Sequence, residues 1–90
     1  RARSFEVSFW RSRDGEEIDF IVEVGQRRFA IECKVGTPSP SNLVKAQRLA
    51  ELDVDKAYVA TLTALNREPW KLTEHWTAVS PLDVPQLCGT

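Results

Sequence analysis

Three side chains in this sequence have the types and spacing to do chemistry together: Asp19 in "IDF", and Glu32 with Lys34 in "IECK". Carboxylate oxygens are the ligands that Mg²⁺ prefers, at about 2.1 Å. A lysine two residues beyond Glu32 on a strand shares its face, where it can reach a phosphate or a water. The alternative is a polar surface on which Lys34 neutralises both acids.

A β-hairpin is the element that would bring these residues together. Period-2 alternation predicts strands over 17–24 and 27–35, joined by a two-residue turn at Gly25–Gln26. Val24 then faces Arg27, and counting back along both strands puts Asp19 opposite Glu32. Like charges at about 4.5–5.5 Å destabilise a sheet. Because such local conflicts tend to fall at functional sites, this pair is the candidate site.

The same register divides the hairpin into two faces. The pairs on the apolar face, which we expect to form the core under a helix, are Ile18 with Cys33, Phe20 with Ile31 and Val22 with Phe29. A second turn at Asp14–Gly15 joins a strand over 4–11 to this hairpin. That turn predicts Phe9 beside Phe20 and Trp10 beside Asp19.

The rest of the chain predicts a crossover and two further strands. Ser39 or Ser41 can cap a helix over 40–52, and Pro40 suits its first position. Strands are predicted over 56–63 and 75–80, a loop over 65–72, and a tail or short helix over 81–87. The predicted fold class is α/β, a mixed sheet in which an antiparallel three-stranded meander precedes a βαβ crossover. The strand after the crossover should run parallel to the strand before it.

Composition sets limits on the class of protein. The 90 residues are enough for one domain over 1–90, with no apolar run long enough for a membrane span. No signal-peptide pattern is present, so a cytoplasmic setting is expected. The absence of Met indicates a fragment of a longer protein.

The net charge of −1 does not attract nucleic acid to the protein as a whole, so a local basic patch would have to do so. Arg11, Arg13 and Arg28 are the candidates, with a solvated sheet edge as the alternative.

The hairpin motif resembles a known superfamily. An Asp followed across a hairpin by Glu-x-Lys is the signature of the PD-(D/E)XK nuclease-like superfamily. The stretch "FWRSRDGEEIDFIVEVGQRRFAIECKVG" is also similar to a C-terminal domain of unknown function that follows many prokaryotic AAA-type ATPases. The resemblance implies a restriction-endonuclease-like core and an ATPase domain in the same parent chain. It also implies Mg²⁺ or Mn²⁺ on Asp19 and Glu32, with Lys34 positioning the water that hydrolyses nucleic acid, DNA being favoured.

One part of the superfamily pattern is missing. Its members commonly carry a further acidic residue on a helix before the first strand, and the printed sequence has no such helix. Glu6 is an imperfect substitute, and Glu17 is a possible further ligand. Gln47 resembles a glutamine that some relatives use near the site, although a solvated helix residue is the alternative. The alternative function is a catalytically inactive accessory or interaction domain, and the exposed sheet edge allows a homodimer.

Overall fold

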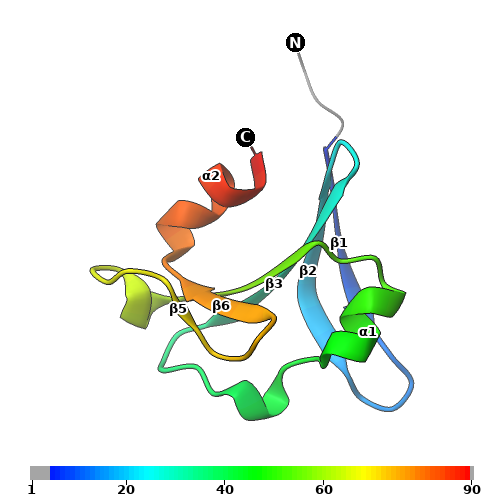
Figure 1. Cartoon of the computed structure of the whole chain (residues 1–90), viewed down its shortest axis with the longest axis horizontal. Helices are drawn as coiled ribbons and strands as arrows, with labels where there is room; N and C mark the ends of the chain where they lie inside the picture. The colour runs from blue at the N-terminus through cyan, green and yellow to red at the C-terminus, as the bar shows by residue number, and fades with distance from the viewer. Residues whose placement is uncertain (1–4, 90) are drawn as a thin grey trace.

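A six-stranded mixed sheet forms the centre of the computed structural model, which describes residues 5–89 (Figure 1). Its strands are β1 (Phe5–Arg11), β2 (Glu17–Val24), β3 (Arg27–Lys34), β4 (Lys56–Thr61), β5 (Trp70–Lys71) and β6 (Trp76–Val79). The helices are α1 (Ala46–Glu51) and α2 (Val84–Gly89), with 3₁₀ turns η1 (Pro40–Asn42), η2 (Leu62–Ala64) and η3 (Pro81–Asp83). Within residues 5–89, no helix is long and apolar enough to cross a membrane.

The strand order, β1-β2-β3-β4-β6-β5, confirms the predicted α/β class with a mixed sheet. Strands β1, β2 and β3 form the antiparallel meander, and β4 runs parallel to β3 after the crossover. Strand β6 continues the sheet parallel to β4. The loop predicted over 65–72 is wrong in one place, because β5 pairs with the end of β6. A strand of two residues is too short to show any period in the sequence.

The predicted register of the second hairpin is confirmed. The pairs between β2 and β3 run from Val24–Arg27 to Phe20–Ile31. Gly25 opens the tight turn with φ of 64°, a left-handed conformation in which a side chain would be strained. The turn therefore fixes which residues of β2 and β3 approach each other, and so the place where Asp19 reaches Glu32.

A β-bulge changes the first hairpin. Ser8 pairs with Ile21 and Trp10 with Ile18, so that β2 has two residues, Asp19 and Phe20, opposite one residue of β1. The prediction that Trp10 lies beside Asp19 is therefore wrong. An extra residue in one strand bends it and interrupts the ladder, and such bulges often re-aim a side chain beside a site. The bulge leaves Asp19 outside the pairing with β1.

Helices cover both faces of the sheet. One core cluster packs α1 against Ile21 and Ala30, and the other packs α2 against Val22 and Phe29. The prediction that the apolar face lies under the first helix is therefore wrong, because that face is covered by α2. The two helices stand well apart in Figure 1. The buried residues of β2 and β3 consequently do not alternate simply, since both faces of the sheet contribute to the core.

Three residues of the predicted apolar face have other surroundings. Phe20 is 43% exposed, and Cys33 is exposed as well. Ile18 is fully buried, but it belongs to the cluster under α1 because the bulge changes the alternation of β2. The face that α2 covers therefore ends before the Asp19 and Glu32 positions. Its apolar contacts are made by the half of the hairpin nearer to the Gly25 turn.

The predicted continuous helix over 40–52 is also wrong, because the chain is extended between η1 and α1. Ser39 does cap η1, accepting a hydrogen bond from the N–H of Ser41 at 3.3 Å. Val44 is then buried, and its carbonyl accepts a hydrogen bond from Nε1 of Trp76 at 2.7 Å. An extended segment lets Val44 fill the core and gives the buried indole N–H its partner. This tertiary contact overrides the helical pattern.

Candidate functional site

Asp19 and Glu32 meet where the pairing of β2 with β3 ends. They come one position beyond the last pair, Phe20 with Ile31. Here the side chain of Asp19, and not a backbone carbonyl, accepts the hydrogen bond from the backbone of β3. Its Oδ2 accepts the N–H of Cys33 at 2.9 Å. The Glu32 carboxyl lies close enough to Asp19 for the side chain and the backbone of Asp19 to shift its pKa. The two carboxyls thus lie close to each other, just beyond the last pair of β2 with β3.

The surroundings of Glu32 favour its protonated form. Burial raises its pKa most, the Asp19 carboxylate raises it further, and together they bring it from 4.5 to about 7. The polar interaction with the Asp19 side chain also raises the pKa of Glu32, whereas the interaction with the Asp19 backbone lowers it. Near neutral pH the Glu32 carboxyl is therefore protonated in a large fraction of the molecules.

Lys34 lies two residues beyond Glu32, at the end of β3, where it pairs with Thr61 of β4. Glu32 and Lys34 line one cavity of about 510 Å³. The other residues around this cavity come from the β1–β2 turn and from the segment before α1; they are Asp14, Gly15, Glu16, Glu17, Ser39, Ser41, Asn42, Leu43, Val44 and Lys45. Asp19 is beside Glu32 but is not one of the residues that line the cavity. The sheet thus brings the predicted lysine to Glu32, and Glu32 to Asp19.

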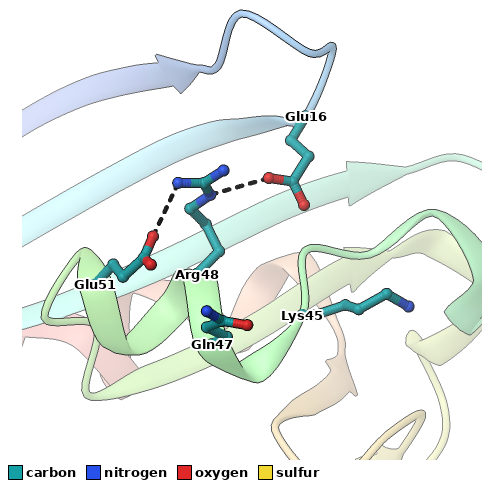
Figure 2. A pocket seen from close by; sticks show the side chains of 5 residues that line it. All are labelled: Glu16, Lys45, Gln47, Arg48 and Glu51. Carbon is teal, nitrogen blue, oxygen red and sulfur yellow. Dashed lines mark hydrogen bonds and ion pairs between the residues drawn. The ribbon is translucent and has the colours of Figure 1, made fainter.

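The three accessory residues have different surroundings. Glu17 lines the same cavity, and its charge contributes to the raised pKa of Glu32. Glu6 pairs with Glu23 in the β1–β2 ladder and lines a separate cavity of about 260 Å³. Gln47 lies on α1 and lines a neighbouring cavity with Lys45 (Figure 2). Of these three accessory residues, Glu17 is therefore the one whose charge acts on Glu32.

The predicted basic residues are distributed along the hairpins. Arg11 pairs with Glu17 at 3.2 Å, and Arg13 is exposed in the turn that follows β1. Arg28 pairs with Glu23 and donates a hydrogen bond from Nη1 to the Leu52 carbonyl at 2.6 Å. The guanidinium of Arg28 thus joins β3 to the end of α1.

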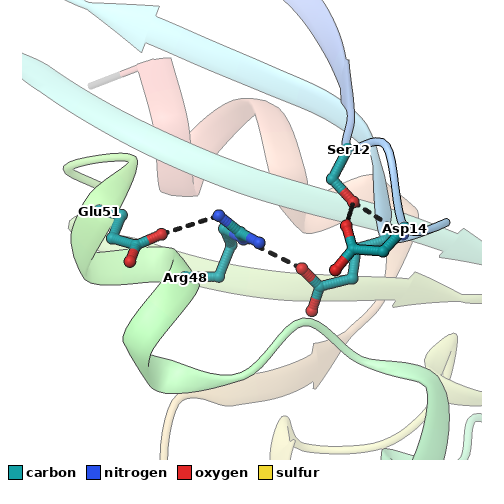
Figure 3. A network of polar contacts seen from close by, with 5 residues as sticks. Ser12, Asp14, Arg48 and Glu51 are labelled. Atoms are coloured by element: carbon teal, nitrogen blue, oxygen red, sulfur yellow. Dashed lines mark hydrogen bonds and ion pairs between the residues drawn. The ribbon is translucent and has the colours of Figure 1, made fainter.

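Arg48 is a residue that the sequence reading missed. Its guanidinium contacts Glu16 at 3.0 Å and Glu51 at 2.8 Å, and it lies 5.5 Å from the centroid of the Trp10 ring. Figures 2 and 3 show Arg48 extended from α1 toward the turn after β1. The i,i+3 spacing could have indicated the contact with Glu51. The contact with Glu16 has no signal in the sequence, because it depends on how α1 packs on the sheet.

The turn itself is fixed by short polar contacts (Figure 3). The Ser12 hydroxyl donates to Asp14 at 2.6 Å, a hydrogen bond that lowers the pKa of that carboxyl. The same hydroxyl accepts the N–H of Glu16 at 3.1 Å. The turn and Arg48 together fix the position of Asp14 and Glu16, which line the cavity of Glu32 and Lys34.

The donor set of the site suits a hard cation only in part. Across residues 5–89, no three acidic, cysteine or histidine side chains are grouped so that they could hold a metal ion. The Asp19–Glu32 pair therefore offers two carboxylates. Mg²⁺ is commonly bound through one or two carboxylates, with waters and substrate phosphates completing its octahedron. The pair fits that mode of binding and not a closed cage.

Comparison with known proteins gives one match. No curated protein matches the chain significantly, and neither does any solved structure. A family model described as "Domain of unknown function (DUF4143)" matches residues 1–80. This match agrees with the similarity of the hairpin region to a domain of unknown function. Since it spans most of the 90 residues, the chain belongs to the DUF4143 family.

Proposed function

We propose that this chain is a nuclease-like module that hydrolyses phosphodiester bonds in nucleic acid, with DNA as the favoured substrate. The observation that carries the proposal is the meeting of Asp19 and Glu32 at the end of the β2–β3 pairing, with Lys34 on the cavity that Glu32 lines. The arrangement is consistent with a restriction-endonuclease-like core. The proposal places the module beside an AAA-type ATPase domain in its parent protein.

Each residue has a distinct part in this function. Asp19 and Glu32 would hold Mg²⁺ or Mn²⁺, an ion that polarises the phosphoryl oxygen and lowers the pKa of a bound water. Both carboxyls must be ionised to bind it, so the pKa of Glu32 near 7 makes the affinity for the ion rise with pH up to about that value. Lys34 would orient the attacking water or donate to a phosphate oxygen.

Cleavage of DNA tests this proposal directly. The chain should cut labelled single-stranded, duplex or branched DNA in Mg²⁺, and EDTA should stop the reaction. Asp19→Asn and Glu32→Gln should each lower the rate at least about 100-fold, since each removes a metal ligand. Glu74→Gln, on an exposed loop, is the matched control and should leave the rate unchanged. Cleavage that persists in both site variants would come from a contaminant and would contradict the proposal.

The second candidate is an inactive accessory domain, and the two-carboxylate donor set is the observation that favours it. Such a domain would keep the fold and offer a surface for assembly. Strand β1 is at one end of the strand order, so its outer edge is open to pairing with a second copy. Absence of cleavage together with concentration-dependent dimerisation would favour this second candidate.

A further inference from the structure

The cavity that Glu32 and Lys34 line extends beyond the carboxyl pair. At about 510 Å³ it falls within the size range of small-ligand sites, and is larger than a metal ion with its waters requires. A second group of polar residues borders it, from η1, from the residue before η1 and from the residue before α1. The members of this group are Ser39, Ser41, Asn42 and Lys45.

Two of the acidic residues that line this cavity are paired with arginines, whereas the Asp14 carboxylate in the β1–β2 turn accepts a hydrogen bond from the Ser12 hydroxyl and keeps its charge. Glu16 lines it, but its carboxylate is paired with Arg48 at 3.0 Å. Glu17 lines it as well and is paired with Arg11 at 3.2 Å. Neither arginine lines the cavity, so each offsets a carboxylate from outside. An anion entering the cavity therefore meets weaker repulsion from Glu16 and Glu17 than from the Asp14 carboxylate, which forms no ion pair among residues 5–89.

Two lysines, Lys34 and Lys45, line this cavity. Among residues 5–89, neither Lys34 nor Lys45 forms an ion pair. Lys45 is exposed, and Figure 2 shows its side chain extended away from Gln47 and Arg48. Two ammonium groups that line one cavity without carboxylate partners are available to a ligand, and phosphate oxygens are their usual partners.

Neutral donors line the same cavity as Lys45. The hydroxyls of Ser39 and Ser41 are 2.9 Å apart, and the N–H of Ser41 donates to the Ser39 hydroxyl at 3.3 Å. One hydroxyl proton is enough for the bond between the two serines, so the other remains available to a ligand. The Asn42 side chain adds amide donors on the same segment. An ammonium, a hydroxyl and an amide together form a typical phosphate-binding set.

We propose that Lys45, with Ser41 and Asn42, forms a second phosphate-binding subsite, which holds a backbone phosphate of a nucleic-acid strand next to the phosphate at Lys34. The identity of the ligand as a nucleic-acid strand rests on the proposed function. The subsite itself needs no metal, because its donors are an ammonium and neutral groups. It would position the strand so that one phosphodiester lies at the Asp19–Glu32 pair.

Binding of a short strand in EDTA tests the subsite. Backbone amide NMR would follow a titration with a 5′-phosphorylated thymidine dinucleotide, with inorganic phosphate as a separate probe. Shift changes should centre on residue 34 and residues 39–45, and Lys45→Gln should weaken the affinity about 5-fold or more. For a longer single-stranded oligonucleotide, Lys45→Gln should also lower the slope of log affinity against log salt by about 0.7.

The matched control is Lys56→Gln, an exposed lysine at the start of β4, whereas the cavity is at the ends of β3 and β4. It should leave the affinity within about 1.5-fold of the parent, since it removes an equal charge from a distant place. Equal weakening by both variants, or no shifts over 39–45, would overturn the subsite. Inorganic phosphate binding as tightly as the dinucleotide would overturn the assignment to a nucleic-acid strand.

The two proposals can fail separately. Strand binding in EDTA without any Mg²⁺-dependent cleavage would support the subsite and contradict the catalytic function. The opposite result is metal binding and cleavage that Lys45→Gln leaves unchanged, with no strand binding in EDTA. That result would support the catalytic function and contradict the subsite. Asp19→Asn should bind the dinucleotide at least as well as the parent, because it removes a negative charge near the strand.

Discussion

The most informative single residue is Glu32. Burial and then the Asp19 carboxylate raise its pKa to about 7, so the folded chain binds this proton more tightly than the unfolded chain does. The stability that the protonated carboxyl contributes is complete below pH 4.5 and is lost as the pH rises through 7. The strain of two adjacent acids therefore acts mainly in neutral and alkaline solution, where a bound cation would relieve it.

Glu32→Gln should remove this pH dependence. At about pH 8.5 the variant should be more stable than the parent by about 1–2 kcal/mol, allowing for the partial exposure of Glu32, and at about pH 4 the two should agree. Urea unfolding at both pH values measures the difference. Glu74→Gln, the exposed control, should change neither value. A variant less stable than the parent at pH 8.5 would mean that Lys34 stabilises the ionised Glu32, as the polar-surface alternative holds.

At the residue scale, the approach of Asp19 to Glu32 was predictable because it depends on one turn. The Gly25–Gln26 turn fixes the register, and the register brings Asp19 to Glu32. The details were not predictable from spacing. The bulge that frees Asp19 from β1, and the bond from the Cys33 N–H to its carboxylate, depend on the geometry of three strands.

At the scale of elements, the strands were predicted better than the helices. Strands β2 and β3 follow from local alternation and from turn chemistry, which need only neighbouring residues. The helix predicted over 40–52 depends on more than its own pattern. Val44 is extended and not helical, because its carbonyl accepts a hydrogen bond from the indole of Trp76, 32 residues further along the chain. No local period contains that information.

Trp76→Phe tests the reason for the interrupted helix. The change keeps an aromatic ring in the core but removes the donor to the Val44 carbonyl, leaving a buried acceptor unpaired. We expect a loss of about 1–3 kcal/mol in the free energy of unfolding, measured by urea denaturation. Trp70→Phe, on the half-buried strand β5, is the control and should cost less. A loss for Trp76→Phe no larger than that of the control would show that the bond contributes little.

At the scale of the whole molecule, the sheet has a helix on each face. Strand periodicity indicated one apolar face, whereas Ile21 and Ala30 on the other face are buried as well. The side that a helix covers is set by the crossover and by the chain after β6, which pattern alone does not give. This arrangement puts α1 on the face that carries Glu32.

The reactivity of the two cysteines tests whether α2 stays packed on its face of the sheet. Cys33 is exposed, whereas Cys88 on α2 is 6% exposed against the second face. With a thiol reagent at about pH 8.5, Cys88→Ser, which leaves only Cys33, should react faster than Cys33→Ser, although burial and the nearby Asp19 raise the pKa of the Cys33 thiol. Cys33→Ser should react slowly, at a rate that urea increases. Similar rates for the two variants would show that α2 does not stay packed on the sheet.

The central claim is that Asp19 and Glu32 form one cation site, and a Mn²⁺ titration of the chain followed by backbone amide NMR tests it most directly. Paramagnetic broadening should centre on residues 17–19 and 32–34, saturate at near-millimolar Mn²⁺ or below, and disappear in Asp19→Asn and in Glu32→Gln. Glu74→Gln should bind as the parent does. If no saturable binding appears by several millimolar, or if it survives in both site variants, the carboxyl pair is not a metal site and the proposed function is contradicted.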